Sequence, residues 1–195
     1  MKDSDPVHTQ YERFPYPPLS ALALPQRKQG ESLRYEWGLQ FAHAKFTPPT
    51  LVSPSLPSTK VVPRNSKHGG IRILVAGCGT LEALVVAQSH PQASEIVAVD
   101  FSQTTLTRLK RRITWAKWAR FPFFRLPRIR TVCTDMTQPL PESIAGQKYD
   151  YIIASNFIHH VQNPAELLKT LARLLTSEGI LRVVTYPQAS RLWMR

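Results

Sequence analysis

The chain has 195 residues, a length that favours one domain built around one core. Its 25 Lys and Arg residues outnumber its 13 Asp and Glu residues, and the formal net charge of +12 favours polyanionic partners such as RNA, DNA or an anionic membrane surface. The N-terminus lacks the apolar core of a secretory signal, and no run approaches the ~18 apolar residues of a membrane span. Neither secretion nor a membrane span is therefore expected.

The two cysteines predict neither a metal site nor a disulfide framework. Cys78 and Cys133 lie in separate apolar stretches and lack the spacing of metal ligands. Two thiols of this kind fit a reducing, cytoplasmic location best.

The first third of the chain is rich in proline. Ten of the 17 prolines lie between Pro6 and Pro63, so long helices and central strands are not expected there. We predict an irregular arm over residues 1–66, followed by a domain over residues 67–195. One short helix is expected within residues 31–46, with four side chains on one face: Leu33, Trp37, Phe41 and Ala44.

From residue 71 onward, short apolar runs alternate with helical periods. The runs predict strands over residues 71–76, 95–100, 129–133, 149–155 and 179–186. Helices are predicted over residues 81–89, 102–118 and 164–175. Strands that alternate with helices imply right-handed crossovers and a parallel, doubly wound α/β sheet. Ligands on such sheets bind at the carboxyl ends of the strands.

The stretch LVAGCGTLEALVVA, residues 74–87, is typical of a strand, a glycine turn and a helix. Gly77 and Gly79 let the backbone approach a ligand, but Glu82 stands where a dinucleotide fingerprint needs glycine and would repel a pyrophosphate. A dehydrogenase is therefore disfavoured. Asp100, at the tip of the second strand, can accept hydrogen bonds from both ribose hydroxyls, which favours an adenosine ligand without pyrophosphate. The alternative is a plain tight turn beside a helix-capping acid.

Between residues 71 and 186 the chain contains five motifs in succession: ILVAGCGT, IVAVDFS, CTDM, YDYIIASNFIHHV and GILRVVTY. In this order they resemble the class I S-adenosylmethionine-dependent methyltransferases. The resemblance implies a Rossmann-like, mainly parallel sheet with strand order 3-2-1-4-5. It also implies S-adenosylmethionine as the cofactor and methyl transfer as the activity.

The resemblance implies roles for individual residues as well. The expected cofactor site comprises Gly77, Cys78, Gly79, Asp100, Phe101, Asp135, Met136 and Asn156. In this family the two glycines would line the methionine moiety, Asp100 would hold the ribose, and residues 135–136 would contact the adenine. Asn156, at the end of the fourth strand, would border the methyl group and the acceptor.

The chain departs from the family pattern in two ways. Leu81 stands where the loop usually has its third glycine, so it would either narrow the cofactor cleft or pack against the helix. The chain also ends at Arg195, just after the fifth strand, whereas the family normally adds two further strands. The long apolar strand would then be an open edge, which implies that the chain is incomplete or that the edge is covered by the arm or by a second copy of the chain in a homodimer.

Two adjacent histidines follow the fourth strand, where an acceptor would enter. Methyl transfer from a sulfonium needs no covalent nucleophile, because the leaving group departs neutral, so positioning dominates. His159 or His160 would take a proton from the acceptor near neutral pH, beside Asn156. In the alternative, one histidine packs or bonds to backbone and the other faces solvent.

An aromatic and proline-rich segment, QYERFPYPPLS, occupies residues 10–20. Similar segments precede the core in some bacterial members of the family, which suggests a lid with Tyr11, Phe14 or Tyr16 touching the ligand. Such a lid excludes water, and aromatic faces attract cations such as a sulfonium. The alternative is a hydrophobic strap over the sheet.

The predicted helix over residues 102–118 lies in the most basic part of the chain, with nine basic and no acidic residues between Phe101 and Thr134. Its inward stripe is expected to comprise Leu106, Leu109, Ile113 and Ala116. The residues expected to contact RNA are Arg108, Arg111, Arg112, Trp115 and Trp118. If the helix ends near Thr114 instead, both tryptophans are buried; a membrane surface or a protein is the third alternative.

We expect an S-adenosylmethionine-dependent methyltransferase that acts on a small molecule. The fourth strand ends in the sequence ASNF, residues 154–157, and lacks N-P-P-Y, the signature of amino-group methylation on bases and glutamine. Two alternatives stay open. One is an RNA methyltransferase or RNA-binding protein that uses the basic segment 108–130. The other is a non-catalytic cofactor-binding or dimerisation module.

Overall fold

The computed structural model describes residues 6–20, 22–26, 29–43, 70–120 and 126–185. Its centre is a five-stranded sheet in the order β3-β2-β1-β4-β5, in which every neighbouring pair is parallel. The strands are β1 (Arg72–Ala76), β2 (Glu95–Asp100), β3 (Ile129–Cys133), β4 (Tyr149–Ser155) and β5 (Leu175–Val184). The predicted doubly wound fold and its strand order are confirmed.

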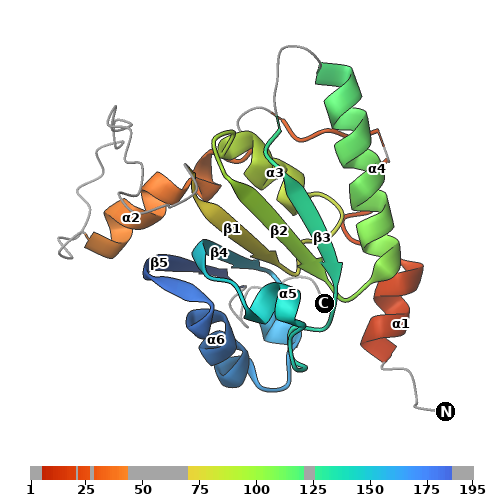
Figure 1. Ribbon diagram of the computed structural model, residues 1–195. Helices are drawn as coiled ribbons and strands as arrows, with labels where there is room; N and C mark the ends of the chain where they lie inside the picture. Colours follow the sequence, from red (N-terminus) through yellow and green to blue (C-terminus); the bar gives the residue numbers. More distant parts are fainter. Residues whose placement is uncertain (1–5, 21, 27–28, 44–69, 121–125, 186–195) are drawn as a thin grey trace, which may run out of the picture.

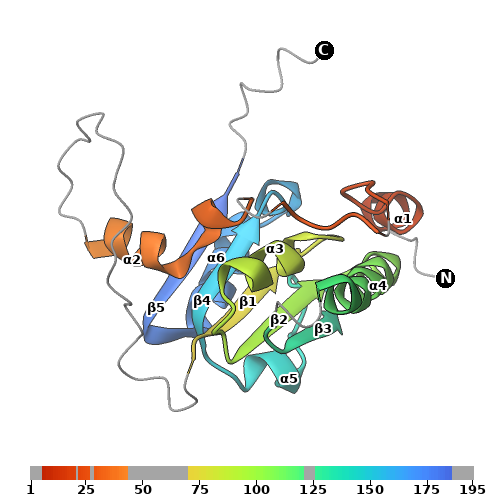
Figure 2. The ribbon, with the colours of Figure 1, turned by 90° about the horizontal axis from the view of Figure 1, so that it is seen from above.

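Helices cover both faces of this sheet (Figures 1 and 2). Helices α3 (Glu82–Ser89) and α4 (Gln103–Arg120) pack on one face, and α5 (Glu142–Ala145) and α6 (Pro164–Arg173) pack on the other. Helix α6 ends two residues before its predicted end, because β5 already pairs with β4 from Leu175. The short 3-10 helix η2 (Ile158–His160) follows β4.

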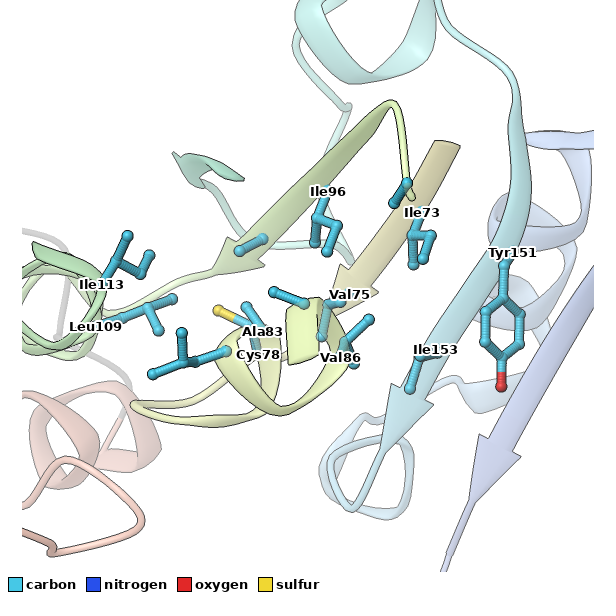
Figure 3. Close-up of a cluster of buried hydrophobic side chains, with 14 of the residues drawn as sticks. Ile73, Val75, Cys78, Ala83, Val86, Ile96, Leu109, Ile113, Tyr151 and Ile153 are labelled. Atoms are coloured by element: carbon cyan, nitrogen blue, oxygen red, sulfur yellow. The ribbon is translucent and has the colours of Figure 1, made fainter. Parts of the chain in front are cut away.

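The core consists of two layers, one on each face of the sheet. Alternate residues of a strand point to opposite faces, so Ile73 and Val75 enter one layer while Leu74 and Ala76 enter the other. Figure 3 shows the first layer, where Leu109 of α4 packs with side chains of β1 and β2. Strands buried on both faces explain the nearly continuous apolar runs of the sequence.

The described part of the arm is more ordered than the proline content predicts. It contains α1 (Pro6–Arg13), which the sequence did not predict, the 3-10 helix η1 (Glu31–Leu33) and α2 (Tyr35–His43). The single helix predicted within residues 31–46 is thus interrupted at Arg34. In this part of the arm the side chain of Tyr35 is buried, whereas those of Leu33 and Trp37 are only partly buried. The side chain of Phe41, and Ala44 altogether, fall outside what the structure describes.

Helix α2 lies against β5 (Figure 2). Gly38 of α2 approaches Ile180 so closely that a Cβ atom there would lie 3.3 Å from its Cγ2. At the other end of the sheet, α1 packs beside α4.

Helix α4 runs through Arg120, so the alternative in which it ends near Thr114 is wrong. The predicted inward stripe is confirmed, since Leu106, Leu109, Ile113 and Ala116 are all buried. Arg112, in contrast, is fully buried and does not belong with the exposed cations, so its predicted contact with RNA needs correction. Trp118 is 73% exposed, and its ring stacks on that of Trp115 at 5.1 Å. Among the described helices, none is long and apolar enough to cross a membrane.

Candidate functional site

A cavity of about 1040 Å³ opens at the carboxyl ends of β1, β2, β3 and β4. Nearly every sequence-predicted site residue contributes to its lining: Gly77, Cys78, Gly79, Asp100, Phe101, Asp135, Met136, Asn156, His159, His160 and Tyr16. The position agrees with the expected ligand site of a doubly wound sheet. Within the described residues, no group of three or more His, Cys, Asp or Glu side chains could hold a metal ion.

The glycine loop adopts a backbone that favours glycine at two positions. Gly77 and Gly79 have φ angles of +66° and +56°. A Cβ atom at Gly77 would lie 2.6 Å from Cδ1 of Phe157, and one at Gly79 would lie 2.9 Å from the carbonyl oxygen of Tyr16. Both glycines therefore permit close approach of other parts of the protein. Leu81, in place of the family's third glycine, is 6% exposed and lines the cavity at the start of α3.

Asp100 faces the glycine loop from the tip of β2. Its Oδ2 accepts a hydrogen bond from Gly79 N at 2.9 Å, and its Oδ1 accepts one from Ser102 N at 3.0 Å. Burial raises the pKa of Asp100, against the opposing effect of these backbone N–H donors. Each carboxylate oxygen has a second lone pair, so Asp100 retains the capacity to accept bonds from a vicinal diol.

The loop after β3 supplies the next part of the wall. Asp135 Oδ1 accepts hydrogen bonds from Thr137 N at 2.8 Å and from Thr137 Oγ1 at 2.7 Å, which fixes the turn. Met136 is buried and offers an apolar surface to the cavity. Across the cavity, burial raises the pKa of the Cys78 thiol, which is therefore neutral at ordinary pH.

The end of β4 carries the residues expected at the acceptor. Asn156 has a φ angle of +61°, a left-handed conformation that Asn adopts more readily than most residues, and its N–H donates to Val184 O at 2.8 Å. His159 and His160 follow in η2 with ring centroids 4.1 Å apart. All three line the cavity, so the structure brings the predicted acceptor residues together.

Glu82 lines the same cavity. In the sequence analysis this residue serves only to disfavour a dinucleotide ligand. Burial raises the pKa of Glu82 to about 7, against the opposing effects of the Ser155 hydroxyl and the Arg182 charge. The sequence feature that predicts Glu82 as a site residue is its position in the first turn of the helix after the glycine loop, because that turn borders the ligand cleft.

The arm forms part of the wall through its backbone. Thr80 N donates to Tyr16 O at 3.0 Å, and Thr80 Oγ1 donates to Pro17 O at 3.0 Å. The guanidinium of Arg112 donates to Leu19 O at 2.6 Å, to Ser20 O at 2.9 Å and to Thr80 O at 2.5 Å. The arm is therefore tied directly to the glycine loop.

A second tie joins the arm to the end of α3. Ser89 Oγ donates to Gly30 O at 2.8 Å, and Tyr35 N donates to Nε2 of His90 at 2.9 Å. Because Nε2 accepts, the ring proton lies on Nδ1, which donates to Val86 O at 2.9 Å. Burial lowers the pKa of His90, in keeping with a neutral ring in this role.

The three aromatic residues of the predicted lid differ in their position relative to the cavity. Tyr16 lines the cavity, with a side chain that is still 63% exposed, as a lid residue would be. Phe14 is 66% exposed and does not line the cavity within the described structure. Tyr11 lies in α1, and its side chain is outside what the structure describes.

Replacing Arg112 by Met is expected to release the arm from the glycine loop. Three backbone carbonyls would lose a charged donor, each such bond contributing about 1.5–3 kcal/mol. The measurement is amide hydrogen exchange at Thr80, whose N–H is protected by Tyr16 O. Exchange should accelerate at Thr80 in this variant. It should stay unchanged in the control Arg111→Met, because Arg111 is exposed on the same helix; equal protection in both variants would show that the tie is dispensable.

Replacing Glu82 by Gln is expected to stabilise the protein at alkaline pH. The folded-state pKa of Glu82 is raised from 4.5 to about 7, so the native state disfavours the carboxylate and loses stability as pH rises through this window. The variant should exceed the wild type in free energy of unfolding by about 3 kcal/mol near pH 8, and the gain should vanish below pH 4.5. Urea denaturation at several pH values measures it, and a gain independent of pH would contradict the burial of this group.

Comparison with known proteins assigns the chain to a family. A family model described as "Methyltransferase domain" matches residues 74–181, more than half of the chain. A protein of Synechococcus sp., "Uncharacterized protein syc1184_c", is 28% identical over 191 residues, which make up 97% of this chain and 38% of that protein. The chain thus spans well under half the length of this curated relative.

Two solved structures are similar to parts of the chain. The plantazolicin methyltransferase BpumL in complex with SAH has a TM-score of 0.49 and 21% identity, over 63% of this chain and 42% of that one. Coclaurine N-methyltransferase bound to N-methylheliamine and SAH has a TM-score of 0.45 and 24% identity, over 59% of this chain and 30% of that one. The family match over residues 74–181 contains the glycine loop, Asp100 and the end of β4. The chain belongs to the methyltransferase-domain family.

Proposed function

We propose that the chain binds S-adenosylmethionine in the cavity and transfers its methyl group to a small-molecule acceptor. The observation that carries the proposal is Asp100, a buried carboxylate at the tip of β2 that faces the glycine loop at the edge of the cavity. Membership of the methyltransferase-domain family supports it. The cavity, at about 1040 Å³, is at the upper end of the usual size of ligand sites, about 300–1,000 Å³.

The residues present fit this cofactor. Asp100 would accept hydrogen bonds from the two ribose hydroxyls, and Asp135 with Met136 would contact the adenine. The glycine loop and Asn156 would border the methionine moiety. When bound, S-adenosylmethionine supplies a methyl group to a lone pair of the acceptor, while its sulfur keeps the bonding electrons and becomes neutral.

The chain's own residues mainly position the reactants and exclude water. Orienting two reactants removes much of the entropic cost of a bimolecular reaction. The backbone of residues 16–20 is held by Thr80 and Arg112, which places Tyr16 on the wall of the cavity, where it would help to exclude solvent. His159 and His160 lie on the wall beside Asn156, within the part of the cavity where we place the acceptor, and an imidazole nitrogen there would take the acceptor's proton.

Replacing Asp100 by Asn is expected to weaken binding of S-adenosylhomocysteine about tenfold to a hundredfold. The change removes the charge from the acceptor of the ribose hydroxyls, and hydrogen bonds to charged groups contribute about 1.5–3 kcal/mol. Isothermal titration of both proteins measures the loss, with circular dichroism to check the fold. The control Glu142→Gln, an exposed carboxylate of α5, should bind like the wild type.

Titration also separates the proposal from its alternatives. A wild-type protein that shows no binding at millimolar S-adenosylhomocysteine is no methyltransferase of this kind. A protein that binds the cofactor but labels no component of a small-molecule extract from labelled S-adenosylmethionine would instead be a cofactor-binding module.

Nucleic-acid contact through α4 is a second candidate, favoured by one observation. Trp118 is 73% exposed and stacked on Trp115 on a helix whose exposed residues include Lys110, Arg111 and Lys117. Exposed aromatic rings between cations suit stacking on bases. Arg112 takes no part, because its guanidinium is bound to backbone carbonyls.

Reversing the charge of Arg108 and Arg111 to Glu is expected to weaken binding of bulk tRNA if α4 contacts nucleic acid. A plot of log affinity against log salt concentration has a negative slope, and each lost phosphate contact reduces its magnitude by about 0.9. The two substitutions should therefore reduce that magnitude by about 2. Filter binding at several salt concentrations measures it. The control Lys148→Glu lies before β4, outside this helix; an equal loss there would indicate a general charge effect.

A further inference from the structure

The cavity differs in charge from the molecule as a whole. The chain has a formal net charge of +12, yet the described residues that line the cavity include no Lys or Arg. They include four carboxyl groups, on Glu82, Asp100, Asp135 and Glu166. Such a cavity attracts cations and repels phosphate and carboxylate groups.

The four carboxyl groups differ in the partners that they have in the protein. Asp100 and Asp135 each accept two hydrogen bonds, and Glu166 Oε1 lies 2.8 Å from Lys169 Nζ. Glu82 forms no ion pair with any residue that the structure describes. A carboxylate has about four acceptor positions, so the Ser155 hydroxyl and the charge of Arg182 leave Glu82 with acceptor capacity for a ligand.

Glu82 also lies where an acceptor would meet the cofactor. It is the first residue of α3, directly after the glycine loop, and its polar neighbours Ser155 and Arg182 come from the ends of β4 and β5. Asn156, the next residue after Ser155, lines the cavity as well. The carboxyl group thus borders the cleft between the loop and the end of β4.

We propose that the methyl acceptor is an amine, and that Glu82 binds its ammonium group and takes its proton. This inference rests on the proposed function. In the step assigned to Glu82, one N–H bond of the ammonium breaks, the proton passes to a carboxylate oxygen, and the nitrogen keeps the electron pair. The nitrogen then has the free pair that methyl transfer requires.

The thiol and phenol groups near Glu82 do not change charge near neutral pH. Burial raises the pKa of the Cys78 thiol and raises that of Tyr151 to about 12, so both are neutral there. Arg182 is the charged neighbour of Glu82. Burial raises the pKa of Glu82 to about 7, so its carboxyl group can hold or release a proton in this range. The two histidines of η2 also line the cavity.

The test compares two adenosine ligands that differ in charge at the reacting position. S-adenosylhomocysteine is neutral there, whereas sinefungin carries an ammonium on the carbon that replaces the sulfur. Contacts with ribose and adenine are shared and cancel in the ratio of the two dissociation constants. The wild type should prefer sinefungin about tenfold, and Glu82→Gln should bring the ratio close to one.

Two controls show whether the preference for sinefungin originates from Glu82. Glu166→Gln removes a cavity carboxylate that Lys169 already neutralises and should keep the tenfold ratio. Between about pH 6 and pH 8 the ratio should rise in the wild type, because Glu82 ionises, and stay flat in Glu82→Gln. A pH dependence that persists in Glu82→Gln would assign the effect to the histidines and overturn the role of Glu82.

The outcomes separate this inference from the proposed function. If S-adenosylhomocysteine binds both proteins equally and the sinefungin ratio does not change, the amine proposal is overturned and the methyltransferase proposal stands. If the wild type binds neither ligand, both are overturned. Glu82→Asp, which keeps the charge on a shorter side chain, should retain part of the preference and so separates charge from side-chain volume.

Discussion

A buried guanidinium holds together two segments on which the cavity depends. Arg112 of α4 binds carbonyl groups of the arm and of the glycine loop, and it forms no ion pair among the described residues. Burial of an unpaired cation is costly unless its donors are satisfied, and burial indeed lowers the pKa of this group. The carbonyl acceptors offset that cost. The glycine loop and one wall of the site are consequently stabilised by the same side chain.

The charged side chains that line the cavity differ in sign from those on the outer face of α4. Lys and Arg side chains lie on the outer face of α4 and elsewhere on the surface. The described residues that line the cavity, in contrast, include carboxyl groups and no Lys or Arg. Screening by salt acts strongly on exposed charges and less on buried or partly buried ones. Binding events at the two places should therefore respond differently to ionic strength.

The sheet and much of the site follow from local patterns in the sequence. Continuous apolar runs identify all five strands, and the placement of Asp100 after the second run identifies the ligand edge. The tie through Arg112 was missed, although its spacing from Leu109 and Ala116 places it on the inward side of the helix. The order within the arm depends on contacts with residues distant in the chain, such as Tyr35 with His90, which leave no local periodic signal.

The arm binds Thr80 through main-chain oxygens of residues 16 and 17 and binds Arg112 through those of residues 19 and 20, so the tie does not require particular side chains at those positions. Prolines at two adjacent positions, Pro17 and Pro18, constrain the path that brings these oxygens into place. Side chains on this segment are thus free to diverge between relatives while the enclosure of the site is maintained. Such a segment is suited to altering the range of accepted compounds, in evolution or by redesign, without rebuilding the scaffold beneath it.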